Sequence, residues 1–123
     1  MQMPIRITFR GLAPSPAIEE RIHARAADLE RFSDRITHCH VVVEAPHRHH
    51  HQGMLYHVRV DLTVPGAHLV VNRQPADHHA HEDVYVALRD AFDAARRQLE
   101  ERVRRQRGAV KAHEPAVRPA AED

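Results

Sequence analysis

The strongest chemical feature of the sequence is an arginine-rich segment near its C-terminus. Residues 96–111 hold seven basic groups against two acidic ones, which leaves an excess of five positive charges. The basic groups are Arg96, Arg97, Arg102, Arg104, Arg105, Arg107 and Lys111. A guanidinium group stays charged and binds phosphate oxygens through paired hydrogen bonds, so the segment is a candidate polyanion-binding site. The alternative is a solvated helix end, where cations also interact favourably with the helix dipole.

Histidine is the second chemically active residue type, with 13 copies in 123 residues. Two clusters fall in predicted loops: His47, Arg48, His49, His50 and His51 in the first, and His78, His79 and His81 in the second. Imidazole binds zinc, nickel and copper, but these histidines show no regular ligand spacing. They could instead donate to phosphates or stack on bases. The clusters are therefore candidate RNA contacts, and a metal-binding or pH-sensing module is the alternative.

Signatures of catalysis do not occur in the sequence. It contains no GxSxG, no HExxH and no phosphate-cradling glycine loop, and it has four glycines in all. The single cysteine, Cys39, falls on the apolar face of a predicted strand, which indicates an inert buried thiol. We therefore expect a protein that is not an enzyme and that has no cofactor and no metal site.

Composition sets the class of protein. A chain of 123 residues with 42% apolar and 4% aromatic residues predicts one globular domain with an aliphatic core. No apolar run approaches the about 18 to 20 residues that a membrane span needs. The N-terminus has no signal-peptide core, so we expect a cytoplasmic protein. The formal net charge of +1 averages over the basic segment and a more acidic remainder.

The first half of the chain predicts two strands around one helix. Residues 4–10 alternate between apolar and polar side chains, as a strand with one buried face does. Ser15 and Pro16 form a strong helix start, and apolar residues at helical spacing extend the predicted helix over 16–32. Residues 37–45 alternate again and predict the second strand.

The second half predicts a hairpin and a long helix. Residues 54–64 alternate clearly, Pro65-Gly66 predicts a tight turn, and 67–73 predict the returning strand. An apolar stripe predicts a helix over 82–107, ended by Gly108. We expect one domain over 1–107 and a disordered tail over 108–123.

The element order predicts an α+β fold. A β-α-β-β-β-α chain can build a two-layer sandwich in which two helices cover one face of a four-stranded sheet, with the first two strands parallel. The other sheet face would carry polar residues: Arg6, Thr8, Arg10, His38, His40, His57 and Arg59. Such a face is either an ordinary solvated surface or an RNA-facing one.

Segment 82–101, EDVYVALRDAFDAARRQLEE, resembles the last helix of the ribosome hibernation-promoting factor family. These proteins are also called ribosome-associated translation inhibitors and sigma-54 modulation proteins. The positions that match are Glu82, Asp83, Tyr85, Ala87, Asp90, Arg97, Gln98 and Leu99. The opening MQMPIRITFRGL and the hairpin LTVPGAHLVVN, residues 62–72, are similar to the family as well.

The resemblance implies both a function and a fold. Family members are not enzymes; they bind the 30S subunit and the 70S ribosome through 16S ribosomal RNA. They occupy the mRNA and tRNA channel, inhibit translation and preserve idle ribosomes. Their fold is similar to a double-stranded-RNA-binding domain. The resemblance implies no membrane and no small-molecule substrate, and no residue specifically supports the role in transcription that the older family name suggests.

The resemblance also assigns candidate contacts to ribosomal RNA on the two predicted helices. These are Arg21, Arg25, Arg89, Arg96, Arg97, Arg102, Arg104, Arg105 and Arg107. Arg97 matches a basic family position, whereas Glu100 and Glu101 stand where many members have Arg or Lys. The arginines that follow would then compensate for these two carboxylates.

Overall fold

Six elements build the protein in the order that the sequence predicts. The computed structural model describes residues 3–45, 56–73 and 83–113. Its elements are β1 (Ile5–Arg10), α1 (Pro16–Phe32), β2 (His38–Glu44), β3 (His57–Val64), β4 (Ala67–Arg73) and α2 (Val84–His113). The predicted start of the third strand at residues 54 and 55 lies outside the described residues.

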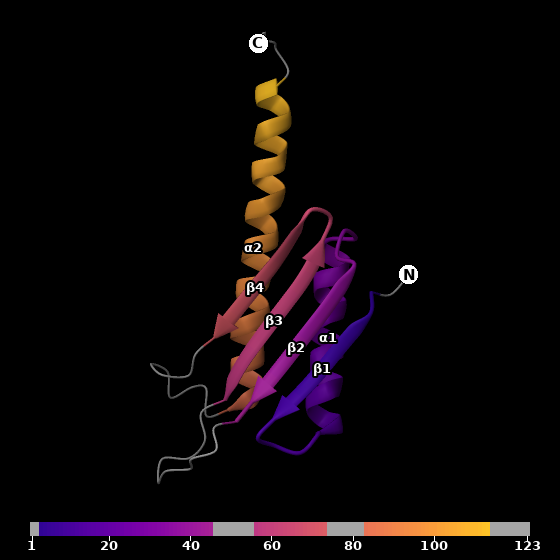
Figure 1. Cartoon of the computed structure of the whole chain (residues 1–123), viewed down its shortest axis with the longest axis vertical. Coiled ribbons are helices and arrows are strands. Elements are labelled where there is room, and N and C mark those ends of the chain that lie inside the picture. The colour runs from indigo at the N-terminus through magenta and orange to yellow at the C-terminus, as the bar shows by residue number, and fades with distance from the viewer. Residues whose placement is uncertain (1–2, 46–55, 74–82, 114–123) are drawn as a thin grey trace.

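The elements form two layers, a four-stranded sheet and a pair of helices (Figure 1). The strand order is β1-β2-β3-β4, with β1 parallel to β2 and the other neighbours antiparallel. Both helices lie on one face of the sheet, and the opposite face carries no helix (Figure 1). The predicted α+β sandwich is therefore confirmed, including the parallel pairing of the first two strands.

Local signals place β1 and α1. The Ser15 side chain accepts a hydrogen bond from the Ile18 amide at 3.3 Å, and Pro16 occupies the first helical position, as the sequence predicts. Gly11 closes β1 with φ +78°, and a Cβ atom there would lie 2.2 Å from the Ala45 carbonyl oxygen. Only glycine fits where the chain leaves β1 beside the end of β2.

The core lies between the helices and the inner sheet face. Alternate residues of β3, from Val58 through Val60 and Leu62 to Val64, are buried, as their spacing predicts. Ile22 of α1 and Leu88 of α2 are fully buried against the sheet. The β3–β4 turn places Gly66 at φ +81°, after Pro65, as a type II turn requires.

The long helix differs from its prediction at both ends. Asp83 caps it, because its side chain accepts from the Tyr85 amide at 2.9 Å and its carbonyl from the Ala87 amide at 3.1 Å. α2 therefore begins at Val84 and not at residue 82. The prediction that Gly108 ends the helix is wrong, since α2 continues to His113. One glycine costs about 1 kcal/mol in a helix, and the good helix formers around it outweigh that cost. Residues 114–123 of the predicted tail lie outside the described residues.

Candidate nucleic-acid interface

Four of the candidate arginines line the seam where α1 meets α2. Arg21 and Arg25 lie one turn apart on α1. Arg89 and Arg96 lie two turns apart on α2. The two helices pack together and contact each other near both ends of this row, as the ring contacts below show. We call these four residues the interhelical seam; it gathers permanently charged groups from two segments that are distant in sequence.

Two aromatic rings support the ends of the seam. The Arg21 guanidinium lies 4.6 Å from the centre of the Tyr85 ring, and the Arg96 guanidinium lies 5.0 Å from the centre of the Phe32 ring. Cation–π contacts of this kind hold a guanidinium over a ring without neutralising its charge. The spacing of α1 predicts that Phe32 belongs to the core, but Phe32 is 36% exposed because it lies at the helix end beside Arg96.

The middle of the seam differs between its two helices. Arg25 is half-buried, and its Nε atom is buried without a hydrogen-bond partner among the described residues. Arg89 is exposed and lies 3.3 Å from a carboxylate oxygen of Asp90. A buried guanidinium nitrogen without an acceptor is unfavourable, so an incoming phosphate oxygen would gain by bonding to Arg25.

Arg102 is used within the fold. Its Nη2 atom donates to the Pro65 carbonyl oxygen at 3.1 Å, so it ties α2 to the β3–β4 turn. It also borders a small cavity of about 30 Å³, together with Val64 and Leu99. Arg102 is a predicted RNA contact, but this geometry directs it toward the hairpin.

The remaining arginines of α2 lie on its exposed side. Arg105 lies 3.1 Å from Glu101, so a carboxylate offsets part of its charge. Arg97, Arg104 and Arg107 are exposed and have no ion pair or hydrogen bond within the described residues. Spacings of seven and three residues place them on one side of the helix. Glu100 lies between them in sequence but is paired with Arg96 at 3.5 Å. We call Arg97, Arg104 and Arg107 the arginine ridge.

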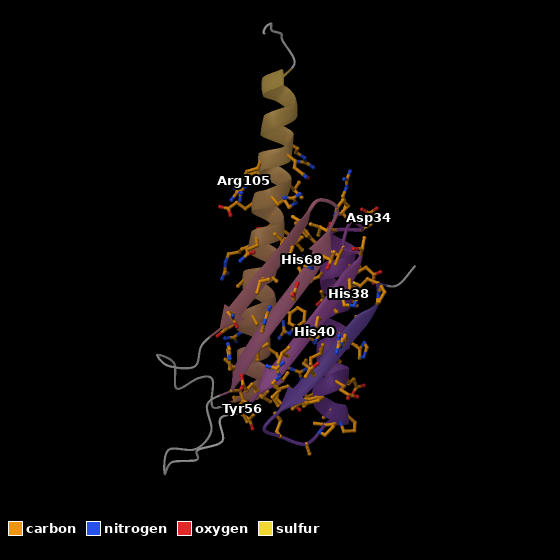
Figure 2. All side chains as sticks on the ribbon, viewed as in Figure 1. Asp34, His38, His40, Tyr56, His68 and Arg105 are labelled. Carbon is orange, nitrogen blue, oxygen red and sulfur yellow. The ribbon has the colours of Figure 1, made fainter. Side chains whose placement is uncertain are left out.

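Two of the three ridge residues, Arg104 and Arg107, lie on the part of α2 that leaves the sheet. Arg102 already reaches the β3–β4 turn, so residues beyond it lie past the end of the sheet (Figure 1). Figure 2 shows Arg105 on this projecting part, away from the sheet. A helix that projects in this way can present its cations to a partner without interference from the rest of the domain.

The two histidine-rich loops are not placed by the structure. His47, Arg48, His49, His50, His51, His78, His79 and His81 all lie outside the described residues. Within the segments that are described, no group of three or more histidine, cysteine or acidic side chains is arranged to hold a metal ion. The proposed roles of the loops in binding RNA or metal therefore stay predictions.

Other expectations concern the thiol and the membrane. Cys39 is fully buried, as its place in the strand predicts. Burial, and then the negative charge of Asp61, raises the pKa of its thiol to about 12, so the thiol stays protonated and unreactive. In the described segments, neither helix has an apolar stretch long enough to cross a bilayer.

Two features of the surface go beyond the candidate contacts on the helices and loops, although the second lies on the sheet face that the sequence already predicts to be polar or RNA-facing. The first is that the rings of Tyr85 and Phe32 hold seam arginines of the opposite helix. The one signal for this was helical spacing, which puts Phe32 on the same side of α1 as Arg21, and Tyr85 on the same side of α2 as Arg96. The open sheet face gathers further cations, namely Arg6, Arg10 and Arg59 beside four histidines. The strict alternation of the strands was the signal for that second group.

The fold and its arginines agree with a match to a known family. The model of the family described as sigma 54 modulation protein / S30EA ribosomal protein matches residues 5–107. The chain belongs to this family, which confirms the resemblance seen in the last helix, the opening strand and the hairpin.

Individual relatives lead in the same direction. The chain is 28% identical over 117 residues to the ribosome hibernation promoting factor of Azotobacter vinelandii, and the match covers 92% of this chain and 98% of that protein. A ribosomal subunit interface protein from Coxiella burnetii shares the fold with a TM-score of 0.63 and 20% identity, over 80% of this chain and 96% of that one. The N-terminal domain of Protein Y from Thermus thermophilus matches with a TM-score of 0.60 and 22% identity, over 82% and 98% of the two chains.

Proposed function

We propose that this protein binds the 30S subunit, alone and within the 70S ribosome, in the channel that carries mRNA and tRNA. Its helix side would contact 16S ribosomal RNA, and the bound domain would inhibit translation and preserve idle ribosomes in the cytoplasm. The names of two relatives support this proposal, since one is called a ribosome hibernation promoting factor and another a ribosomal subunit interface protein.

The observation that carries the proposal is the arginine ridge in a chain of this family. Arg97, Arg104 and Arg107 are exposed, and no carboxylate in the described residues forms an ion pair with them. Guanidinium groups bind phosphates in a bidentate manner, and a folded RNA offers phosphates at close intervals. The interhelical seam extends the same cationic surface along α1.

Steric exclusion accounts for inhibition without any chemical step. A domain seated in a channel prevents mRNA and tRNA from occupying the same volume. Recognition would depend on the shape and backbone of the RNA more than on base edges, because arginine–phosphate contacts carry no sequence information. The function therefore needs no catalytic group and no cofactor.

Sedimentation with purified 30S subunits and 70S ribosomes tests the proposal. We expect the protein to co-sediment with both at 50 mM salt. If the three ridge arginines each contact a phosphate, the affinity falls roughly 20- to 40-fold between 50 and 200 mM salt, because each contact releases counterions. Failure to co-sediment at 50 mM salt would contradict the proposal.

A charge-reversal variant locates the surface. We expect Arg97→Glu, Arg104→Glu and Arg107→Glu together to lower the affinity for 30S subunits by more than tenfold and to flatten its salt dependence. The matched control reverses Arg31, Arg35 and Arg118, none of which belongs to the candidate RNA contacts or to the sheet face, with the same change in net charge. Equal losses in the two variants would show that overall charge, and not the ridge, determines binding.

A further inference from the structure

The open face of the sheet carries a second cationic surface that the helices do not touch. Four histidines lie at strand positions whose side chains point away from the core. They are His38 and His40 on β2, His57 on β3 and His68 on β4. Figure 2 shows His38, His40 and His68 on the face of the sheet opposite the helices. Each is exposed or half-buried, so each can reach a partner.

Three arginines share this face with the histidines. Arg6 is paired in register with His40, and Arg10 with Glu44 at the other end of the same strands. Arg59 lies on β3, opposite Val42 of β2 and Asn72 of β4. Strands are about 4.8 Å apart, so the cationic positions cover about 14 Å across the four strands.

Only two carboxylates in the described residues face these seven groups. Glu44 lies 3.5 Å from His57 Nδ1, and Asp61 lies 3.8 Å from both His68 Nε2 and the Arg59 guanidinium. With neutral histidines the face carries three positive charges against two negative ones, an excess of one. When all four histidines are protonated the excess rises to five, so the charge of this surface depends on pH.

The local hydrogen bonds persist in both protonation states. His40 Nε2 lies 2.9 Å from the Thr8 hydroxyl and His68 Nε2 lies 3.0 Å from the Thr63 hydroxyl. A hydroxyl donates to a neutral ring and accepts from a protonated one. His57 Nε2 lies 2.8 Å from Asn72 Oδ1 and can donate to it in either state. Charging the face therefore needs no rearrangement of these side chains.

His40 is held neutral at pH 7. Burial, and then the positive charge of Arg6, lowers the pKa of its ring, while Asp61 acts in the opposite sense. A phosphate bound beside Arg6 and His40 would favour protonation of His40, because its negative charge offsets the positive charge of Arg6.

We propose that this open sheet face is a second RNA-binding surface, which holds the sugar-phosphate backbone when its histidines are protonated. A nucleic acid carries a charge at every residue, which suits cations that are spread over four strands. A protein partner would need an apolar or aromatic centre, and on this face Val70, 40% exposed, is the one exposed large apolar side chain among the described residues. All five aromatic residues of the chain lie elsewhere, in the core or on the helices, so binding would involve phosphates and not base stacking.

The test uses free RNA, so it does not depend on ribosome binding. The probe is a 12-residue oligouridylate with a pH-insensitive rhodamine label, and fluorescence anisotropy gives its affinity at pH 7.5 and 5.5 in 50 mM salt. All variants carry Arg97→Glu, Arg104→Glu and Arg107→Glu, which removes the ridge. We expect the affinity to rise about tenfold at pH 5.5 as the added charges release counterions. No rise would overturn the proposal.

Two histidine variants locate the effect. The sheet variant changes His38, His40, His57 and His68 to Gln, which keeps hydrogen bonding but cannot become charged. The control changes His23, an exposed histidine on α1 that belongs to no proposed binding surface, to Gln. We expect the rise to fall below twofold in the sheet variant and to persist in the control. The reverse result, or a full rise in both, would overturn the proposal.

A measurement without histidine substitutions guards against misfolding of the sheet variant. We expect the oligouridylate to shift the ring signals of His38, His40 and His68 in proton–carbon NMR spectra at pH 5.5. Unshifted signals would overturn the proposal. Vesicles of phosphatidylglycerol, a phosphate surface of another kind, serve as the comparison. If they bind at pH 5.5 through the same histidines while the oligouridylate does not, the surface recognises membranes and the RNA proposal is wrong.

Discussion

The two faces of the molecule carry positive charge in different ways. On the helix side the charge belongs to arginines, and the ridge residues Arg97, Arg104 and Arg107 have no carboxylate partner in the described segments. On the sheet face most of the potential charge belongs to histidines, and Glu44 and Asp61 lie within 4 Å of His57 and His68. The first surface is cationic at every physiological pH, whereas the second becomes strongly cationic only on acidification.

This difference follows from the elements that bear the residues. A helix that projects into solvent can space arginines by three, four or seven residues and leave each one exposed. A sheet instead brings side chains of neighbouring strands within about 5 Å, so every cation has close neighbours of either sign. Net charge alone, +1 for the whole chain, conceals both surfaces.

The largest expected effect comes from replacing the ridge arginines on the helix side with histidine, the main ionisable residue type of the sheet face. In a variant with Arg97→His, Arg104→His and Arg107→His, the new side chains are mostly neutral at pH 7.5, so we expect roughly 20-fold weaker binding to 30S subunits. At pH 5.5 the imidazoles are protonated and much of the affinity should return. Co-sedimentation at both pH values measures this. Equal weakness at pH 5.5 would show that guanidinium geometry, and not charge, is what the ridge supplies.

A smaller effect separates two neighbouring arginines of α2. Arg102→Gln removes the hydrogen bond to Pro65, so we expect the free energy of unfolding to fall by about 1 kcal/mol with unchanged binding to 30S subunits. Arg104→Gln should do the reverse, with unchanged stability and an affinity lowered several-fold. Urea denaturation and co-sedimentation check the pair. Weaker ribosome binding by a fully folded Arg102→Gln protein would place Arg102 in the interface.

The smallest effect concerns the pH dependence of stability. Because burial and Arg6 lower the pKa of His40, the unfolded chain binds a proton more readily than the folded one just below the ordinary pKa of about 6.5. The stability that neutral His40 provides is therefore complete above that pH and is lost as the pH falls through the lowered pKa. We expect His40→Gln to flatten the decline of the melting temperature between pH 7 and 5.

A variant on the same strand serves as the control for that measurement. His38→Gln removes a neighbouring histidine from the same face and leaves His40 in place. The His40 explanation predicts that the decline of melting temperature persists in this variant. An equal flattening in both would assign the decline to the general charge of the face.

Sequence patterns with a short period are enough to predict most of the fold. Alternation along residues 57–64 predicts which side of the sheet is buried, and Ser15-Pro16 predicts the start of α1 to the residue. The end of α2 was predicted wrongly because a glycine such as Gly108 does not by itself end a helix. Whether the helix continues depends on the helix propensities of the residues around the glycine.

Tertiary contacts are what the sequence could not supply for the candidate site. The arginine-rich segment was evident, but its members look alike along the chain. Arg102 is bound internally because the β3–β4 turn lies beside it, and Arg96 lies over a ring from α1 that is far away in sequence. The division of the arginines into seam, ridge and internal contact therefore needed the structure.

The projecting end of α2 also affects how the molecule moves. α2 runs along the long axis of the molecule and continues past the sheet (Figure 1). A particle with such an extension rotates more easily about its long axis than end over end. Its hydrodynamic drag therefore exceeds that of a sphere of equal mass, 14.1 kDa, so we expect the free monomer to elute in gel filtration ahead of a compact protein of its size.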